Sequence, residues 1–86
     1  MIMTNYSLDI QQIGQNKQIY TDCNSISIIN QGTNDIIIDQ MITVSPGQSF
    51  VIEGNEGETC RHRFFLAFTG AGTSNCVVIR KLYINI

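Results

Sequence analysis

The residues with the greatest potential for chemistry lie around the one histidine of the chain. Cys60 and His62 are separated by a single residue, and Glu56 and Glu58 precede them. In an extended segment, Cys60 and His62 share a face, with their Cβ atoms about 7 Å apart. That distance is too long for the direct hydrogen bond by which a histidine activates a cysteine nucleophile. No Asn or Asp stands nearby in sequence to orient the imidazole, so we predict that the protein is not an enzyme.

A metal site is the alternative role for the same residues. Structural zinc requires four nitrogen or sulfur ligands, which usually occur in closely spaced pairs. Cys60 and His62 are the only local ligands of this kind, and Cys23 and Cys76 would have to be brought to them by folding. We therefore expect no metal and no other cofactor, and we interpret the two glutamates as solvent-exposed loop acids.

Ligand-binding motifs give little further indication. No GxxxxGK[ST] sequence occurs, and the loop at residues 70–72 lacks the third glycine of a dinucleotide-binding motif. Tyr6, Tyr20 and Tyr83 could stack on sugar rings, although such residues more often pack at a sheet edge. A small ligand-recognition module, either carbohydrate-binding or Ig-like and adhesive, is therefore the alternative function.

The low content of charged residues is the most unusual feature of the composition. Asp, Glu, Lys and Arg make up 14% of the chain, against about 25% in an average soluble domain. A surface of neutral polar groups can be buried against a neighbouring subunit without the desolvation cost of ions. We therefore expect protein partners. Five basic residues and a net charge of −2 argue against nucleic acid as a partner.

The cysteines and the N-terminal segment indicate the compartment. Cys23, Cys60 and Cys76 form an odd set without CxxC spacing, which favours a reducing compartment and buried thiols. Residues 1–6 have neither the basic start nor the apolar core of a signal peptide. No apolar run approaches the roughly 20 residues of a membrane-spanning helix. We expect synthesis in the cytoplasm and no membrane partner.

Isoleucine is the commonest residue, and β-branched side chains favour strands. Apolar and polar residues alternate, and nowhere do apolar residues hold helical spacing over three turns. We expect one all-β domain over residues 1–86, with residues 1–5 as a candidate N-terminal arm. Its architecture should be a small β-sandwich, Ig-like or jelly-roll-like, of about seven or eight antiparallel strands. The strands are predicted at residues 6–13, 17–21, 25–30, 34–39, 41–44, 48–53, 62–69 and 75–86.

Three local features can be predicted in more detail. Residues 25–30 and 34–39 should pair as a hairpin, each with isoleucines on its inner face. Residues 45–48, Ser-Pro-Gly-Gln, have the composition of a type II turn. The last strand is either an open sheet edge available for pairing or an interior strand of the sandwich.

The segments 27–38 (SIINQGTNDIII) and 44–50 (VSPGQSF) carry a pattern of small β-sandwich modules. In that pattern an Ile-x-Asn-x-Gly-Thr/Asn hairpin is followed by a Pro-Gly-Glu/Gln-Ser turn. The chain resembles Ig-like modules of surface proteins and small structural proteins of tailed-phage virions, notably capsid auxiliary (decoration) proteins. The chain begins with Met and has no signal peptide, which favours the phage proteins. The shared positions shape turns, so no functional residue is transferred.

The resemblance implies a non-enzymatic structural protein on a phage virion, made in the host cytoplasm. It would act as a capsid auxiliary protein, bound to other virion proteins such as a major capsid protein or to further copies of itself. Apolar chain ends left free would expose sticky surface, which favours a role for them in contacts. As partner-contact residues we expect three of the N-terminal arm, two of a loop and one of the last strand, namely Met1, Ile2, Met3, Arg61, Arg63 and Tyr83.

Overall fold

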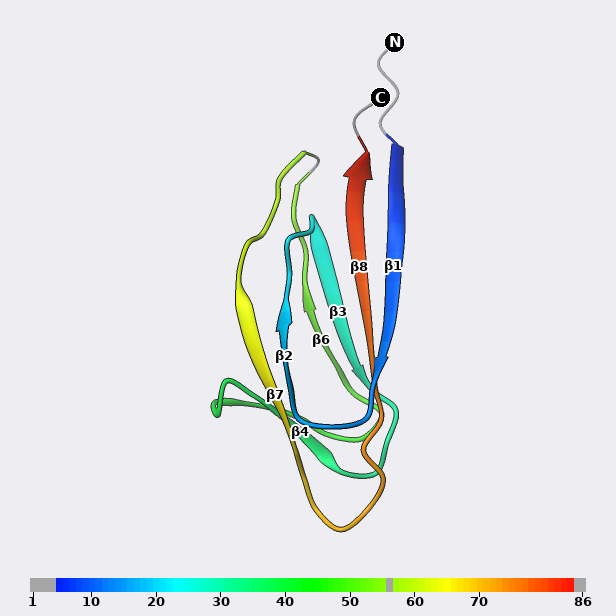
Figure 1. Cartoon of the computed structure of the whole chain (residues 1–86), viewed down its shortest axis with the longest axis vertical. Helices are drawn as coiled ribbons and strands as arrows, with labels where there is room; N and C mark the ends of the chain where they lie inside the picture. Colours follow the sequence, from blue (N-terminus) through cyan, green and yellow to red (C-terminus); the bar gives the residue numbers. More distant parts are fainter. Residues whose placement is uncertain (1–4, 56, 85–86) are drawn as a thin grey trace.

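A computed structural model of the protein describes residues 5–55 and 57–84, which form eight strands in two antiparallel sheets (Figure 1). Within these residues there is no helix, so the prediction of an all-β sandwich is confirmed. The strands are β1 (Asn5–Ile13), β2 (Lys17–Tyr20), β3 (Ser25–Asn30), β4 (Asp35–Ile38), β5 (Ile42–Val44), β6 (Ser49–Ile52), β7 (Arg63–Thr69) and β8 (Cys76–Ile84).

The order of the strands is that of a jelly roll. Sheet A has the order β1-β8-β3-β6, and sheet B has the order β2-β7-β4-β5. The pairs β1–β8, β2–β7, β3–β6 and β4–β5 nest like the two arms of one long hairpin. Rolling this hairpin up brings β3 beside β8 and β4 beside β7, which completes each sheet. Of the two predicted sandwich types, the jelly roll is therefore the one observed.

The prediction that residues 25–30 and 34–39 pair with each other as a hairpin is wrong. The two strands exist, but β3 lies in sheet A and β4 lies in sheet B, so the chain crosses between the sheets after Asn30. Ile28 and Ile36 are both fully buried, and they enter the core from opposite sheets. Alternation determines which face of a strand is buried, but it does not determine the neighbouring strand.

Two buried asparagines hold this crossing. Asn30 donates from Nδ2 to the carbonyls of Asn34 and Val44, at 2.7 and 2.9 Å. Asn34 donates from Nδ2 to the carbonyl of Gly72 at 3.1 Å and accepts from the Gly72 amide at 2.7 Å. These amide side chains form hydrogen bonds with backbone groups at the point where the chain leaves one sheet for the other, so those backbone groups are not left unpaired. In the described part of the chain, every buried side-chain nitrogen or oxygen has a hydrogen-bond partner.

A tight hairpin turn joins β4 to β5. Asp39 and Gln40 have φ angles of 51° and 58°, and the Met41 amide donates to the Ile38 carbonyl at 3.0 Å. Two central residues with positive φ, closed by this bond, are typical of a type I′ turn. The turn went unpredicted because neither central position holds the Gly or Asn that usually marks it.

Two further sequence predictions have clear outcomes. The type II turn at residues 45–48 is confirmed, since Gly47 has a φ of 81° and the Gln48 amide donates to the Ser45 carbonyl at 2.9 Å. The last strand, β8, lies between β1 and β3, so its assignment as an open edge is wrong and its interior placement is correct (Figure 1). In sheet A the open edges are β1 and β6.

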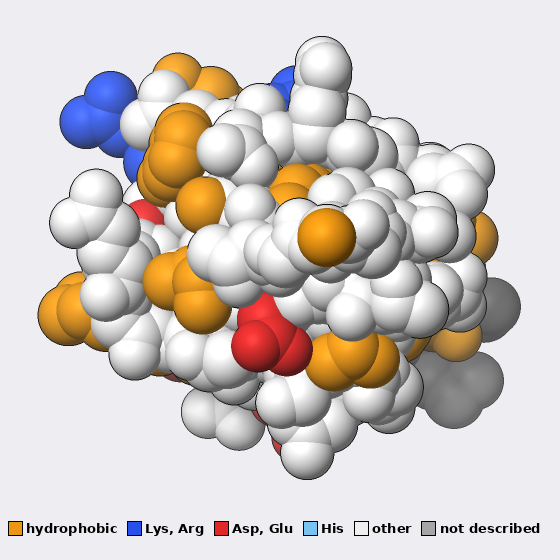
Figure 2. All heavy atoms as spheres, turned by 90° about the horizontal axis from the view of Figure 1, so that it is seen from below, with side chains coloured by type: hydrophobic (Ala, Val, Ile, Leu, Met, Phe, Trp, Pro, Cys, Tyr) orange, Lys and Arg blue, Asp and Glu red, His pale blue; other side chains and the backbone are white. Residues whose placement is uncertain are grey.

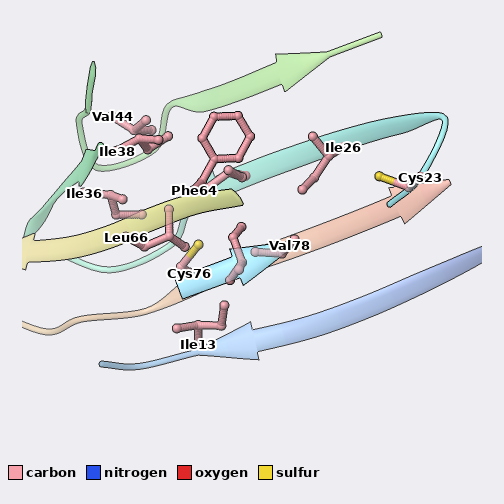
Figure 3. Packing of buried hydrophobic residues seen from close by; sticks show 12 residues of the cluster. Ile13, Cys23, Ile26, Ile36, Ile38, Val44, Phe64, Leu66, Cys76 and Val78 are labelled. Atoms are coloured by element: carbon pink, nitrogen blue, oxygen red, sulfur yellow. The ribbon is translucent and has the colours of Figure 1, made fainter. Parts of the chain in front are cut away.

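The core lies between the two sheets and is rich in isoleucine (Figure 3). Strand β7 has Phe64 and Leu66 inward and Phe65 outward, as its alternation predicted. The buried hydrophobic residues are Ile13, Ile19, Cys23, Ile26, Ile28, Ile36, Ile38, Val44, Phe64, Leu66, Cys76 and Val78.

Candidate functional site

The outer side of sheet A is the candidate functional site. Successive side chains of a strand point to opposite sides of its sheet. On β1 the outward residues are Tyr6, Leu8 and Ile10, which are 57%, 56% and 64% exposed. Ile79 of β8 lies directly opposite Ile10, and Val77 is the next outward residue of β8. The two strands therefore present a band of mainly apolar side chains, with Lys81 opposite Leu8 and Gln12 opposite Val77.

The band continues across the sheet to its other edge. Ile29 of β3 lies opposite Val77, and Ser27 of β3 lies between Ile79 and the exposed Val51 of β6. A contiguous apolar patch on a protein surface marks a site of interaction with another protein, a membrane or a ligand. We call this surface the apolar face; it consists of Tyr6, Leu8, Ile10, Ile29, Val51, Val77 and Ile79.

A buried arginine explains why β1 turns its apolar side outward. Arg80 of β8 points into the sandwich and is 9% exposed. Its Nη1 lies 3.2 Å from Asp9 Oδ2 and 3.2 Å from Gln11 Oε1, and its Nε donates to the Tyr20 carbonyl at 2.9 Å. A buried guanidinium requires such acceptors. Because Asp9 and Gln11 must point inward to reach it, Ile10 and its alternating neighbours point outward.

A lysine lies between two tyrosines at one end of the apolar face. Lys81 Nζ is 4.8 Å from the ring centroid of Tyr6 and 5.2 Å from that of Tyr83. Both distances are within the roughly 6 Å range of cation–π interactions. Tyr83 also faces Tyr6 directly in the β1–β8 register. The predicted contact residue Tyr83 therefore borders the apolar face.

The other predicted contact residues lie elsewhere. Arg63 faces Tyr20 across the β2–β7 ladder, on the outer side of sheet B, so the structure does not bring it together with Tyr83. Met1, Ile2 and Met3 lie outside the described residues, and Asn5 of the predicted arm is already the first residue of β1. Arg61 and Arg63 instead line an open, shallow pocket together with Tyr20, Asp22 and His62.

Cys60 and His62 each have a different partner. His62 Nε2 lies 3.6 Å from Asp39 Oδ2, and its ring centroid lies 4.5 Å from that of Phe64. Cys60 faces Cys23 across an isolated antiparallel bridge. Among residues 5–55 and 57–84, no three His, Cys, Asp or Glu side chains come close enough together to hold a metal ion. Asp39 is far from His62 along the chain, so only the pairing of β4 with β7 brings the two residues together.

Sequence reasoning also missed the apolar face. Tyr6, Leu8 and Ile10 have the spacing of an inward strand face, and on β1 itself only Ile13, which alternates out of step with them, marks them as outward. A further indication of the orientation of β1 comes from the last strand, where Arg80 points to the same side as the core residues Cys76 and Val78. An inward arginine requires polar side chains from the strand beside it, which identifies the polar side of β1 as its inner side.

Neutral polar side chains and backbone dominate the end of the molecule seen in Figure 2, where few charged groups are visible. Comparisons of the chain with protein-family models, with curated proteins and with solved structures give no match. No helix in the described part of the chain is long and apolar enough to cross a membrane. The function is therefore inferred from the chain's own surface.

Proposed function

We propose that this protein is a non-enzymatic structural protein that docks its apolar face on another protein subunit. The exposure of Leu8 and Ile10, with Ile79 of β8 directly opposite Ile10, is the observation that carries the proposal. Burial of apolar surface is favourable by about 25 cal/mol per Å². A partner that covers this face would therefore gain affinity from side chains that contribute little to the fold.

The edge of sheet A supports the same role. Strand β1 has nine residues, whereas the other edge strands β2, β5 and β6 have three or four. Its sequence contains no Pro and no Lys, the residues that commonly block pairing at a sheet edge. Its one charged residue, Asp9, is paired with Arg80. A strand of the partner could add to this edge by backbone hydrogen bonds while its side chains cover Leu8 and Ile10.

The specific form that we propose is an auxiliary (decoration) protein of a tailed-phage capsid, located on the virion and docked on the major capsid protein. The turn pattern of residues 27–50 and the small number of charged residues support this form. The jelly roll is compatible with it, since many viral capsid domains have this fold. A fold hosts many functions, so the apolar face carries more weight than the topology.

Composition of the assembled particle is the first test. Phage particles purified by sedimentation should contain this chain at a constant molar ratio to the major capsid protein, measured by quantitative mass spectrometry. Recovery of the chain only as a folded, free monomer would contradict the proposal. Pairing of the chain with further copies of itself would appear as a defined oligomer in sedimentation of the purified protein.

Surface variants test whether the apolar face is the contact. Leu8→Glu and Ile10→Glu should remove the chain from the particle and leave it folded, because both side chains are exposed. Phe65→Glu is the matched control, since Phe65 is 44% exposed on the outer side of sheet B. If the Phe65 variant is absent from the particle and the Leu8 and Ile10 variants are present, the docking surface is on sheet B instead.

A carbohydrate-recognition module is the alternative. Tyr6 and Tyr83 lie opposite each other on one sheet, and paired aromatic rings can stack on sugars. Tyr20 lies on the outer side of the other sheet and cannot share that platform. On this alternative, Tyr83→Ala abolishes glycan binding and retains the fold. A glycan array without a hit argues against it.

A further inference from the structure

Cys23 and Cys60 face each other directly across the isolated bridge between the β2–β3 corner and the segment before β7. The Cys23 amide donates to the Cys60 carbonyl at 3.2 Å, and the Cys60 amide donates to the Cys23 carbonyl at 2.7 Å. Residues that exchange both hydrogen bonds in this way have Cα atoms about 5.5 Å apart. Disulfide-bonded cysteines most often have Cα atoms about 5.5–6 Å apart. The backbone therefore already has the separation that a disulfide requires.

We propose that Cys23 and Cys60 form a reversible disulfide bond, which makes this end of the sandwich a thiol-oxidation site. Cβ atoms of directly opposed residues lie about 4.5–5.5 Å apart, and hydrogen-bonded pairs such as this one are at the wider end of that range. A disulfide brings the Cβ atoms to about 3.5–4.5 Å, so the two segments must approach by roughly 1 Å. The bridge allows this approach because it is isolated rather than held inside a continuous ladder. The strain that is left makes the bond easier to reduce, which is why it is reversible.

Hydrogen bonds hold the two cysteines opposite each other before any oxidation. Thr21 donates from Oγ1 to the Cys60 carbonyl at 2.8 Å. Asn24 donates from Nδ2 to the carbonyls of Asn55 and Glu58, at 2.6 and 2.9 Å. Both Thr21 and Asn24 are buried, and both lie within two residues of Cys23 in the sequence. The loop that carries Cys60 is thus held by hydrogen bonds to the corner that carries Cys23.

Differences in burial set the order of the chemistry. Cys60 is partly exposed and Cys23 is buried, so Cys60 meets the oxidant first. Its thiolate attacks a low-molecular-weight disulfide such as glutathione disulfide and releases one glutathione thiol. Cys23 then loses its proton and attacks the Cys60 sulfur, which releases the second glutathione. The protein loses two protons and two electrons, and the S–S bond of the oxidant is reduced to two thiols.

Cys76 is excluded from the pair by its position. It lies opposite Ile13 and Asn30 at the start of β8, whereas the corner of Cys23 is bonded near the end of β8, where the Asn24 amide donates to the Lys81 carbonyl at 2.7 Å. Five residues of strand separate these points, which is about 16 Å. Figure 3 shows Cys76 beside Leu66 and Ile13, with Cys23 at the far end of the core. One pair and one buried thiol therefore account for the odd number of cysteines.

Thiol counting on the purified, folded chain tests the proposal, whether or not the proposed function is correct. After treatment with glutathione disulfide, the denatured chain should show one free thiol in place of three, and its mass should be lower by two hydrogens. Combined digestion with a glutamate-specific protease and trypsin places the three cysteines on separate peptides, because the chain is cut after Glu53, Glu58, Arg61 and Arg63. The peptides of Cys23 and Cys60 should stay joined until a reductant is added. Three free thiols after oxidation would overturn the proposal.

Single-cysteine changes supply the controls. Cys60→Ser replaces the partly exposed sulfur by an oxygen that can keep the contact with Thr21 Oγ1, and this variant should retain both of its thiols under the same treatment. Cys76→Ala should lose both of its remaining thiols. A dimer cross-linked through Cys60, or a peptide that joins Cys23 to Cys76, would overturn the proposal.

Discussion

Arg80 donates a hydrogen bond from Nε to the backbone carbonyl of Tyr20 at 2.9 Å, and this bond joins the interior of sheet A to the edge of sheet B. The same guanidinium holds Asp9 of β1 at 3.2 Å. Because Asp9 must point inward, Leu8 and Ile10 on either side of it point outward. Arg80, together with the buried Ile13 on the same side of β1 as Asp9, thereby determines which side of β1 is available to a partner.

Removal of the Arg80 guanidinium should destabilise the free chain. Arg80→Met keeps much of the side-chain volume and removes every donor, which leaves the Tyr20 carbonyl without its partner. We expect the free energy of unfolding to fall by about 2 kcal/mol, measured by urea denaturation. Asp9→Asn should cost less than about 1 kcal/mol, because the Asp9 side chain is 59% exposed. Equal costs would show that the ion pair, and not the bond to Tyr20, supplies the stability.

Isoleucines on the two sides of sheet A should respond differently to the same change. Ile28 is fully buried in the core, so Ile28→Thr should lower the free energy of unfolding by about 2–4 kcal/mol through lost packing and a buried hydroxyl. Ile10 is exposed, so Ile10→Thr should change it by less than about 0.5 kcal/mol. Chemical denaturation of the monomer measures both. A cost above about 2 kcal/mol at Ile10 would mean that the apolar face packs within the monomer.

Glycine at position 40 should stabilise the β4–β5 turn. Gln40 has a φ of 58°, in the left-handed region that costs an L-residue about 1–2 kcal/mol. Glycine removes this cost but adds about 0.4–1 kcal/mol of unfolded-chain entropy. Gln40→Gly should therefore raise the free energy of unfolding by about 0.5 kcal/mol or more, which thermal melting detects. Thr43→Gly, in strand β5, is the control and should lower it.

Stability should decrease at alkaline pH because of Cys76. Burial raises the pKa of the Cys76 thiol from 9.0 to about 11. Above pH 9 the unfolded chain loses this proton while the folded chain keeps it, so deprotonation favours unfolding. The stability that the buried, protonated Cys76 thiol supplies is fully present below about pH 9 and is lost as the pH rises toward the folded-state pKa. By about pH 10 the free energy of unfolding should be lower by about 1.4 kcal/mol than at neutral pH.

Comparison with Cys76→Ala separates this effect from other alkaline titrations. Urea denaturation at about pH 8 and about pH 10 should show a smaller decrease in the variant than in the parent chain. Burial also raises the pKa of the Cys23 thiol, which Arg80 opposes, so part of the decrease should persist in the variant. Equal decreases in the two proteins would contradict the assignment to Cys76.

Strand positions were predictable because alternation is a local property. The predicted strand at residues 25–30 coincides with β3, and those at residues 6–13 and 62–69 differ from β1 and β7 by one residue at one end. The alternation of isoleucines and polar residues that indicates each strand lies entirely within that strand's own segment of the sequence. The composition likewise indicated an all-β chain with a weakly charged surface.

Pairing and the orientation of β1 depended on tertiary structure. Residues 25–30 and 34–39 have the sequence of a hairpin, yet they entered opposite sheets, because a period of two specifies a buried face and not a neighbour. Tyr6, Leu8 and Ile10 have the spacing of a core face, yet they point outward, because the opposite side of β1 carries the core residue Ile13 and the acceptors of Arg80.

The sequence by itself thus determined the strands, the isoleucine core and the small number of charges, since each depends on residues close together in the chain. Only the tertiary structure decided that Arg80 meets Asp9 and Tyr20, that Cys23 faces Cys60, and that an apolar face is left on sheet A. These relationships join residues far apart in the chain. They follow from the register of whole strands, which is set when all of the strands pack together.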